Sequence, residues 1–126
     1  MRTGVVIIVL AIAADCGGPP SVSAADVERC LADTLGEKGW AEIPLSETGT
    51  VYGVDFGPNS VHLFIEPDAS AVEEQIGSIR EAEEAVGNTG PGDQVILRDR
   101  GNVLFSWANE PTADQRALVE RCVGFS

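Results

Sequence analysis

TVYGVDFGPNSVHLFI, residues 50–65, is the stretch that decides the fold. It contains two runs rich in β-branched and aromatic residues, TVYGVDF and VHLFI, and each has the length of a strand. Between them, GPNS has the composition of a tight turn. A helical spacing of apolar residues follows over residues 68–86. The stretch therefore predicts a hairpin that leads into a helix, which is a β-β-α unit.

The same order of elements returns further along the chain. Residues 94–98 (QVILR) and 103–107 (VLFSW) form a second pair of strand-like runs. A helical pattern over residues 112–123 follows them, and Thr112 and Gln115 at its start have the spacing of a capping box. The sequence therefore predicts a second β-β-α unit.

Two further segments complete the domain. A helical pattern covers residues 25–35, whereas residues 37–49 have no clear period and predict an irregular connection. The elements together predict one α+β domain with the order α-β-β-α-β-β-α. Two hairpins can join edge to edge, so we expect a four-stranded antiparallel sheet with the helices mainly on one face.

The N-terminus has the layout of an export signal. Arg2 supplies a positive charge, and an apolar run of ten residues, VVIIVLAIAA, ends before Asp15. A helix of that length reaches about 15 Å, half of a hydrocarbon core of roughly 30 Å, so a signal segment fits better than a membrane-spanning anchor. We expect a signal peptide at 1–15, a flexible tether at 16–24 and the folded domain at 25–126.

Cys16 follows the apolar run and precedes Gly, Pro and Ser residues. This segment resembles a bacterial lipoprotein precursor, in which the cysteine after the signal receives a lipid and becomes the new N-terminus. The resemblance implies lipidation at Cys16 and a membrane partner through that lipid. Asp15 departs from the small uncharged residue expected there. The alternative is cleavage after Ala24, in the small-x-small sequence VSA, which would release a secreted protein.

The chain has three cysteines. Cys30 and Cys122 lie in the first and last helical patterns, and an exported protein can oxidise such a pair. We expect a disulfide between them, with two buried free thiols as the alternative. Cys16 would then be the one left over, and lipidation would give it a chemical use.

Composition narrows the possible partners. The chain has 20 Asp and Glu against 8 Lys and Arg, and its formal net charge is −12. Such a surface repels phosphate backbones, so nucleic-acid binding is disfavoured. A basic or cationic protein is the partner that charge favours, and charge that only keeps an exported domain soluble is the alternative.

Few residues predict chemistry. His62 is the only histidine, and no G-x-S-x-G, C-x-x-C or H-E-x-x-H motif occurs. We therefore expect no catalytic residue, no metal and no cofactor. A small hydrolase that uses His62 with Asp55 or Glu66 remains the alternative from another class.

Tyr52, His62 and Trp107 are the residues that we expect on a binding face if one side of the sheet is open. Burial of the large aromatics in the core is the alternative. The sequence thus predicts an extracytoplasmic binding or accessory module of the cell envelope, anchored by a lipid on Cys16. A secreted form, and a secreted protein inhibitor, are the other hypotheses.

Overall fold

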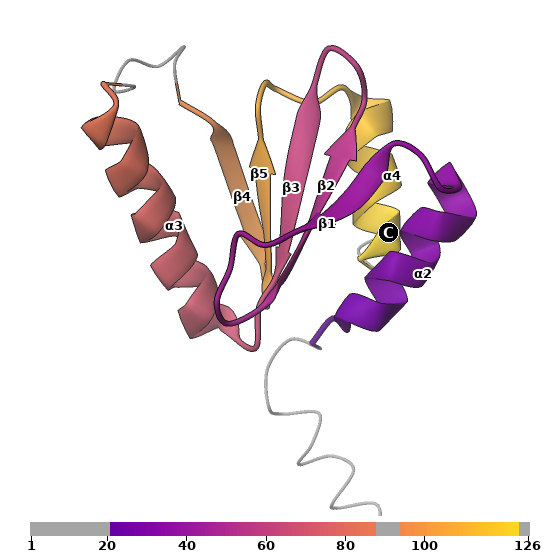
Figure 1. Cartoon of the computed structure of the whole chain (residues 1–126), viewed down its shortest axis with the longest axis horizontal. Helices are drawn as coiled ribbons and strands as arrows, with labels where there is room; N and C mark the ends of the chain where they lie inside the picture. Colours follow the sequence, from indigo (N-terminus) through magenta and orange to yellow (C-terminus); the bar gives the residue numbers. More distant parts are fainter. Residues whose placement is uncertain (1–20, 88–93, 124–126) are drawn as a thin grey trace, which may run out of the picture.

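The computed structural model describes residues 21–87 and 94–123, and Figure 1 shows their arrangement. The described residues form an α+β fold in which groups of antiparallel strands lie between helices. In chain order they are α2 (Ala24–Leu35), β1 (Trp40–Ile43), β2 (Thr50–Asp55), β3 (Ser60–Ile65), α3 (Ala69–Ala85), β4 (Ile96–Arg100), β5 (Val103–Trp107) and α4 (Ala113–Cys122).

The strands form one antiparallel sheet with the order β1-β2-β3-β5-β4. The two predicted hairpins, β2–β3 and β4–β5, join through β3 and β5, and Leu63 lies opposite Phe105 in that pairing. The prediction of four strands is wrong, because the described residues contain a fifth, β1. It falls within residues 37–49, which the sequence pattern predicts to be irregular.

β1 is a short edge strand that depends on its neighbour. It pairs only with β2, with Trp40 opposite Val54 and Ile43 opposite Val51, and Pro44 follows directly after its last residue. The N–H of Leu45 donates to the carbonyl of Ile43 at 2.9 Å, so the chain turns there and the strand ends. Four residues are too few for a period of two to show in the sequence, and pairing with β2 supplies the order that the pattern lacks.

The helices cover both faces of the sheet, so the prediction that they lie mainly on one face is also wrong. Figure 1 shows α2 and α4 on one side and α3 on the other. The central strands carry apolar side chains on both faces, and both need cover. On the α3 side, the buried residues are Val51, Phe64, Val72 and Leu104.

The larger core lies between the sheet and the helices α2 and α4. Its buried side chains include Val27, Leu31, Leu63, Phe105 and Val119. Burial of about 25 cal/mol per Å² of apolar surface makes this cluster the main stabilising contribution of the fold.

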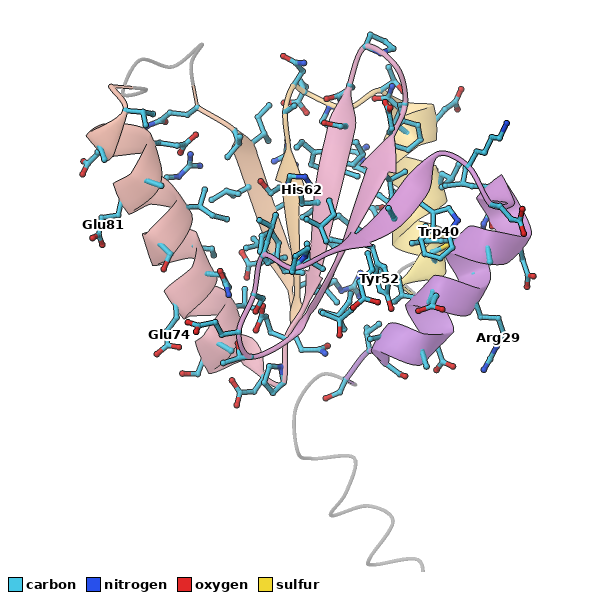
Figure 2. The ribbon with its side chains drawn as sticks, viewed as in Figure 1. Arg29, Trp40, Tyr52, His62, Glu74 and Glu81 are labelled. Atoms are coloured by element: carbon cyan, nitrogen blue, oxygen red, sulfur yellow. A yellow bond between two sulfur atoms is a disulfide. The ribbon has the colours of Figure 1, made fainter. Side chains whose placement is uncertain are left out.

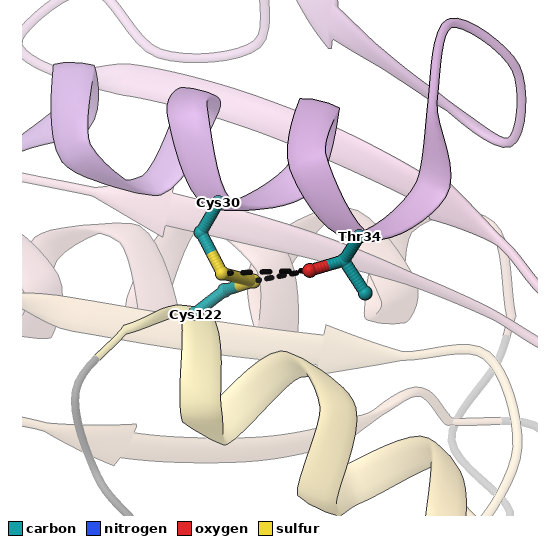
Figure 3. Close-up of a disulfide and its surroundings, with 3 residues drawn as sticks. All are labelled: Cys30, Thr34 and Cys122. Atoms are coloured by element: carbon teal, nitrogen blue, oxygen red, sulfur yellow. Dashed lines mark hydrogen bonds between the residues drawn. A yellow bond between two sulfur atoms is a disulfide. The ribbon is translucent and has the colours of Figure 1, made fainter.

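A disulfide joins the two helices of this layer, as the sequence predicts. Cys30 of α2 and Cys122 of α4 are bonded, with a Cα–Cα distance of 5.3 Å (Figure 3). The hydroxyl of Thr34 lies 3.8 Å from the sulfur of Cys30 and 3.9 Å from that of Cys122. The start and the end of the domain are therefore covalently tied together.

The buried side-chain amide of Asn102 holds the segment that precedes α2. The main-chain N–H of Val22 donates to Oδ1 of Asn102 at 2.8 Å, and Nδ2 of Asn102 donates to the carbonyl of Val22 at 2.9 Å. The same Nδ2 also donates to the carbonyl of Glu66 at 2.9 Å. Val22 packs against the larger core as well. Val22 lies within the predicted tether, yet the turn after β4 holds it as part of the fold.

Candidate functional site

A groove lies on the sheet face that α3 covers only in part. It extends over β1, β2 and β3, because α3 packs against β4 and β5, and it is an open groove with a volume of about 510 Å³. We call it the His62 groove. Among the residues that line it are Ala41, Ile43, Gly53, Asp55, Ser60 and His62.

Small residues on β1 and β2 create this hollow. Gly53 lies opposite Ala41 on β1 and opposite His62 on β3. A Cβ atom on Gly53 would overlap Cδ1 of Ile43 and would lie 3.4 Å from Cδ2 of His62. Ile43 therefore lies over the glycine, and a larger residue at position 53 would displace its side chain.

The polar residues that line the His62 groove include Asp55, Ser60 and His62. Asp55 and Ser60 are direct cross-strand partners, and His62 lies two residues beyond Ser60 on the same face of β3. Oδ1 of Asp55 accepts a hydrogen bond from the N–H of Gly57 at 2.7 Å. Within the described residues, no hydrogen bond connects the imidazole of His62 to either of the other two side chains.

His62 is half-buried in this groove, and its burial lowers the pKa of the imidazole below its ordinary value of 6.5. The neutral imidazole is favoured near pH 7, because desolvation penalises the charged form. A neutral imidazole has one N–H donor and one acceptor nitrogen. Together with the hydroxyl and the carboxylate, it can position a polar group of a bound molecule.

Tyr52 and Trp107 do not share a surface with His62. They are 2% and 0% exposed and belong to the core beneath α2 and α4, and Figure 2 shows Tyr52 toward α2 and His62 on the body of the sheet. The hydroxyl of Tyr52 donates to the carbonyl of Ala24 or to Oε1 of Glu28, each at 3.1 Å. Of the three residues, only His62 lines the His62 groove.

The surroundings of Tyr52 strongly perturb the pKa of its phenol. Burial raises the pKa of the phenol to about 12, and the hydrogen bond to Glu28 and the charges of Glu28 and Glu42 act in the same direction. The phenol therefore stays protonated and contributes hydrogen bonds to the fold.

Glu66, the second carboxylate of the hydrolase hypothesis, has a structural environment. It is 2% exposed, and its carboxylate accepts hydrogen bonds from the hydroxyls of Ser46 at 2.8 Å and Thr48 at 2.5 Å. These bonds fasten the connection between β1 and β2 to the end of β3. Glu66 is not among the residues that line the His62 groove.

A second groove borders β1 on the side of α2, and the sequence patterns do not predict it. We call it the acidic groove. It encloses about 420 Å³, and its lining includes Glu28, Glu37 and Glu42 together with Ala32, Trp40 and Ala41. The three carboxylates come from α2, the loop after it and β1. Their separation along the chain hides the cluster from a motif search, because only pairing of β1 with β2 brings them together.

Several predictions fall outside these grooves. Cys16 lies outside the described residues, so its lipidation stays a prediction. The described part of the chain contains no group of three or more His, Cys, Asp or Glu that could hold a metal ion. In the same ranges, no helix has the length and apolar character needed to cross a bilayer.

Comparisons with models of protein families, with curated proteins and with solved structures find no match to this chain.

Proposed function

We propose that the chain is an exported protein, anchored to the outer face of the cell membrane through a lipid on Cys16, that acts as a binding module of the envelope. The attachment of Val22 to Asn102 is the observation that carries the anchoring part of the proposal. The His62 groove carries the binding part.

The position of Val22 favours processing at Cys16 over cleavage after Ala24. Cleavage after Ala24 would remove Val22 and leave the amide of Asn102, which is 5% exposed, without two of its hydrogen bonds. A typical intramolecular hydrogen bond contributes about 0.5–1.5 kcal/mol to stability. Processing at Cys16 keeps Val22 and Ser23 in the mature chain, so the domain retains these contacts.

The disulfide supports export. Bonds of this kind persist in oxidising compartments outside the cytoplasm. Because Cys30 and Cys122 are joined to each other, Cys16 is the only one of the three cysteines that the disulfide does not use. A free thiol on an exported segment is reactive, whereas a lipidated cysteine is not.

Mass spectrometry of the protein from the membrane fraction tests the anchor. We expect a mature N-terminus at Cys16 that carries a diacylglyceryl group, and a Cys16→Ser variant that loses the lipid and leaves the membrane fraction. An unmodified mature N-terminus at Ala25 would overturn the proposal.

Photo-crosslinking in intact cells tests the binding role. A photoreactive amino acid is placed at position 62, in the His62 groove, and in a matched control at position 81, where Glu81 is exposed on α3 (Figure 2). We expect crosslinks to one envelope protein of basic composition from position 62 only. Equal crosslinking from both positions, or none from position 62, would contradict a binding role for this groove.

A small hydrolase is the second candidate, because Asp55, Ser60 and His62 line one groove. A serine nucleophile needs a general base within hydrogen-bond reach, and contacts of this kind often tighten only when a substrate binds. A fluorophosphonate probe distinguishes the two functions. We expect no labelling of Ser60. Labelling that is lost in both Ser60→Ala and His62→Ala would establish the hydrolase instead.

A further inference from the structure

β1 has an outer edge with free hydrogen-bonding capacity. In the described part of the chain it pairs with β2 alone. The carbonyl of Gly39 accepts from the N–H of Asp55 at 2.8 Å, so Gly39 faces β2. Antiparallel pairing alternates, and it therefore directs the main chain of Ala41 and Ile43 toward β2 and that of Trp40 and Glu42 outward. Each outward residue offers one N–H and one C=O to another strand.

The opposite edge of the sheet, β4, is protected against pairing with another chain, and β1 is less protected. β4 carries consecutive charges at Arg98, Asp99 and Arg100, which discourage pairing with another chain. β1 has the sequence WAEI and carries a single charge, that of Glu42. The comparison favours β1 as the edge that accepts an added strand.

The two grooves flank this edge and meet at it. Trp40 and Ala41 line both the His62 groove and the acidic groove. Successive side chains of a strand point to opposite faces of a sheet. A strand added beside β1 would therefore direct alternate side chains toward the His62 groove and toward the acidic groove.

The two grooves have different linings, and these linings indicate which side chains the added strand carries. The acidic groove is lined by the carboxylates of Glu28, Glu37 and Glu42 and by no Lys or Arg. The floor of the His62 groove is made of small residues such as Gly53 and Ala41. A fitting strand has basic residues at every second position and uncharged residues of moderate size between them.

We propose that β1 binds an extended basic segment of a partner polypeptide as an added strand, with alternate basic side chains in the acidic groove. This inference rests on the proposed function and names the class of partner and the mode of binding. Main-chain hydrogen bonds to Trp40 and Glu42 supply affinity, and the grooves supply specificity. A second copy of this chain is a poor occupant, because two chains of net charge −12 would bring like charges together.

Titration of the full chain in detergent with two synthetic peptides tests this mode. In the first peptide, of about eight residues, Arg alternates with Thr, and in the second the same residues stand in two blocks. Tryptophan fluorescence reports binding, because Trp40 is half-buried at the edge whereas Trp107 is fully buried in the core. We expect the alternating peptide to bind about tenfold more tightly, because only its pattern matches two grooves. Equal affinities of the two peptides would show that charge attraction alone accounts for binding, and would overturn the proposal.

Two substitutions at position 42 distinguish the contribution of a main-chain N–H to peptide binding from that of the side-chain charge. Glu42→Pro removes an outward N–H while the hydrogen bonds of β1 to β2 remain, and Glu42→Gln removes the charge alone. We expect Glu42→Pro to weaken binding of the alternating peptide about tenfold more than Glu42→Gln does. Equal effects would contradict strand addition. If both peptide tests fail while position 62 still crosslinks to a partner, the edge mode is rejected and the proposed function stands.

Discussion

Asn102 is the residue that joins the entry of the chain to the sheet. Removing its side-chain amide removes buried hydrogen bonds to Val22 and Glu66. We expect Asn102→Ala to lower the free energy of unfolding by about 2 kcal/mol, measured by urea denaturation. Asn109→Ala is the control, because that side chain is exposed and makes one long hydrogen bond of 3.5 Å. Equal losses in the two variants would contradict the role of Asn102.

Tyr52 is the only tyrosine of the chain, so tyrosinate absorbance reports its ionisation alone. We expect a midpoint at about 12 in the folded protein, and a lower midpoint in Glu28→Gln, which removes one neighbouring charge. Because folding raises this pKa, the phenol contributes stability that is fully present below pH 10 and lost as the pH rises toward 12. A midpoint at the ordinary value of 10 would show that the phenol is exposed.

Most helices and strands could be predicted from the sequence, because the signals that define them lie within the same segment of the chain. The hairpin over residues 50–65 follows from its turn, and α4 begins with the expected reciprocal capping of Thr112 and Gln115. α3 begins at Ala69, and the preceding Asp68 caps it by accepting a hydrogen bond from the N–H of Ala71 at 2.9 Å. β1 could not be predicted, because a short edge strand depends on contacts with β2 that no local pattern encodes.

The packing of β1 on β2 gives a test of that missed element. Gly53→Ala forces a methyl group against Ile43, and we expect a loss of about 1–3 kcal/mol in the free energy of unfolding. In Gly53→Ala combined with Ile43→Ala the overlap disappears, so the double variant should be more stable than additivity predicts, by about 1 kcal/mol. The measurement is a double-mutant cycle in urea.

Gly77→Ala is the matched control for this cycle. Gly77 is an exposed residue in the middle of α3, and a Cβ atom added to it would meet no other atom within 4 Å. Alanine favours a helix, so the free energy of unfolding should rise by about 0.5–1 kcal/mol. If the effects at positions 43 and 53 simply add, β1 does not pack against β2 in this register.

The disulfide determines the stability of the domain as a whole, because it ties together helices whose cysteines are 92 residues apart. Replacing both Cys30 and Cys122 with alanine should lower the free energy of unfolding by about 2–4 kcal/mol, since the unfolded chain gains conformational freedom. Urea denaturation of the double variant, compared with the oxidised parent chain, measures the loss. A variant as stable as the oxidised parent would contradict this role.

The candidate site was less predictable than the fold, for reasons that concern the assembled molecule. His62 could be recognised as a lone histidine, but Tyr52 and Trp107 belong to the opposite face, because both faces of the sheet are apolar and covered. The acidic groove forms only when β1 is placed beside α2. Its carboxylates look like scattered surface charge in the sequence, and the fold alone brings them to one edge.

Hydrogen exchange at individual amides of β1 tests whether this edge receives a strand. The full chain in detergent micelles is compared with and without the peptide in which Arg alternates with Thr. We predict that the peptide slows exchange at the outward amides of Trp40 and Glu42, and leaves Ala41 and Ile43, which already face β2, unchanged. Uniform protection along β1, or none at Trp40 and Glu42, would contradict the account.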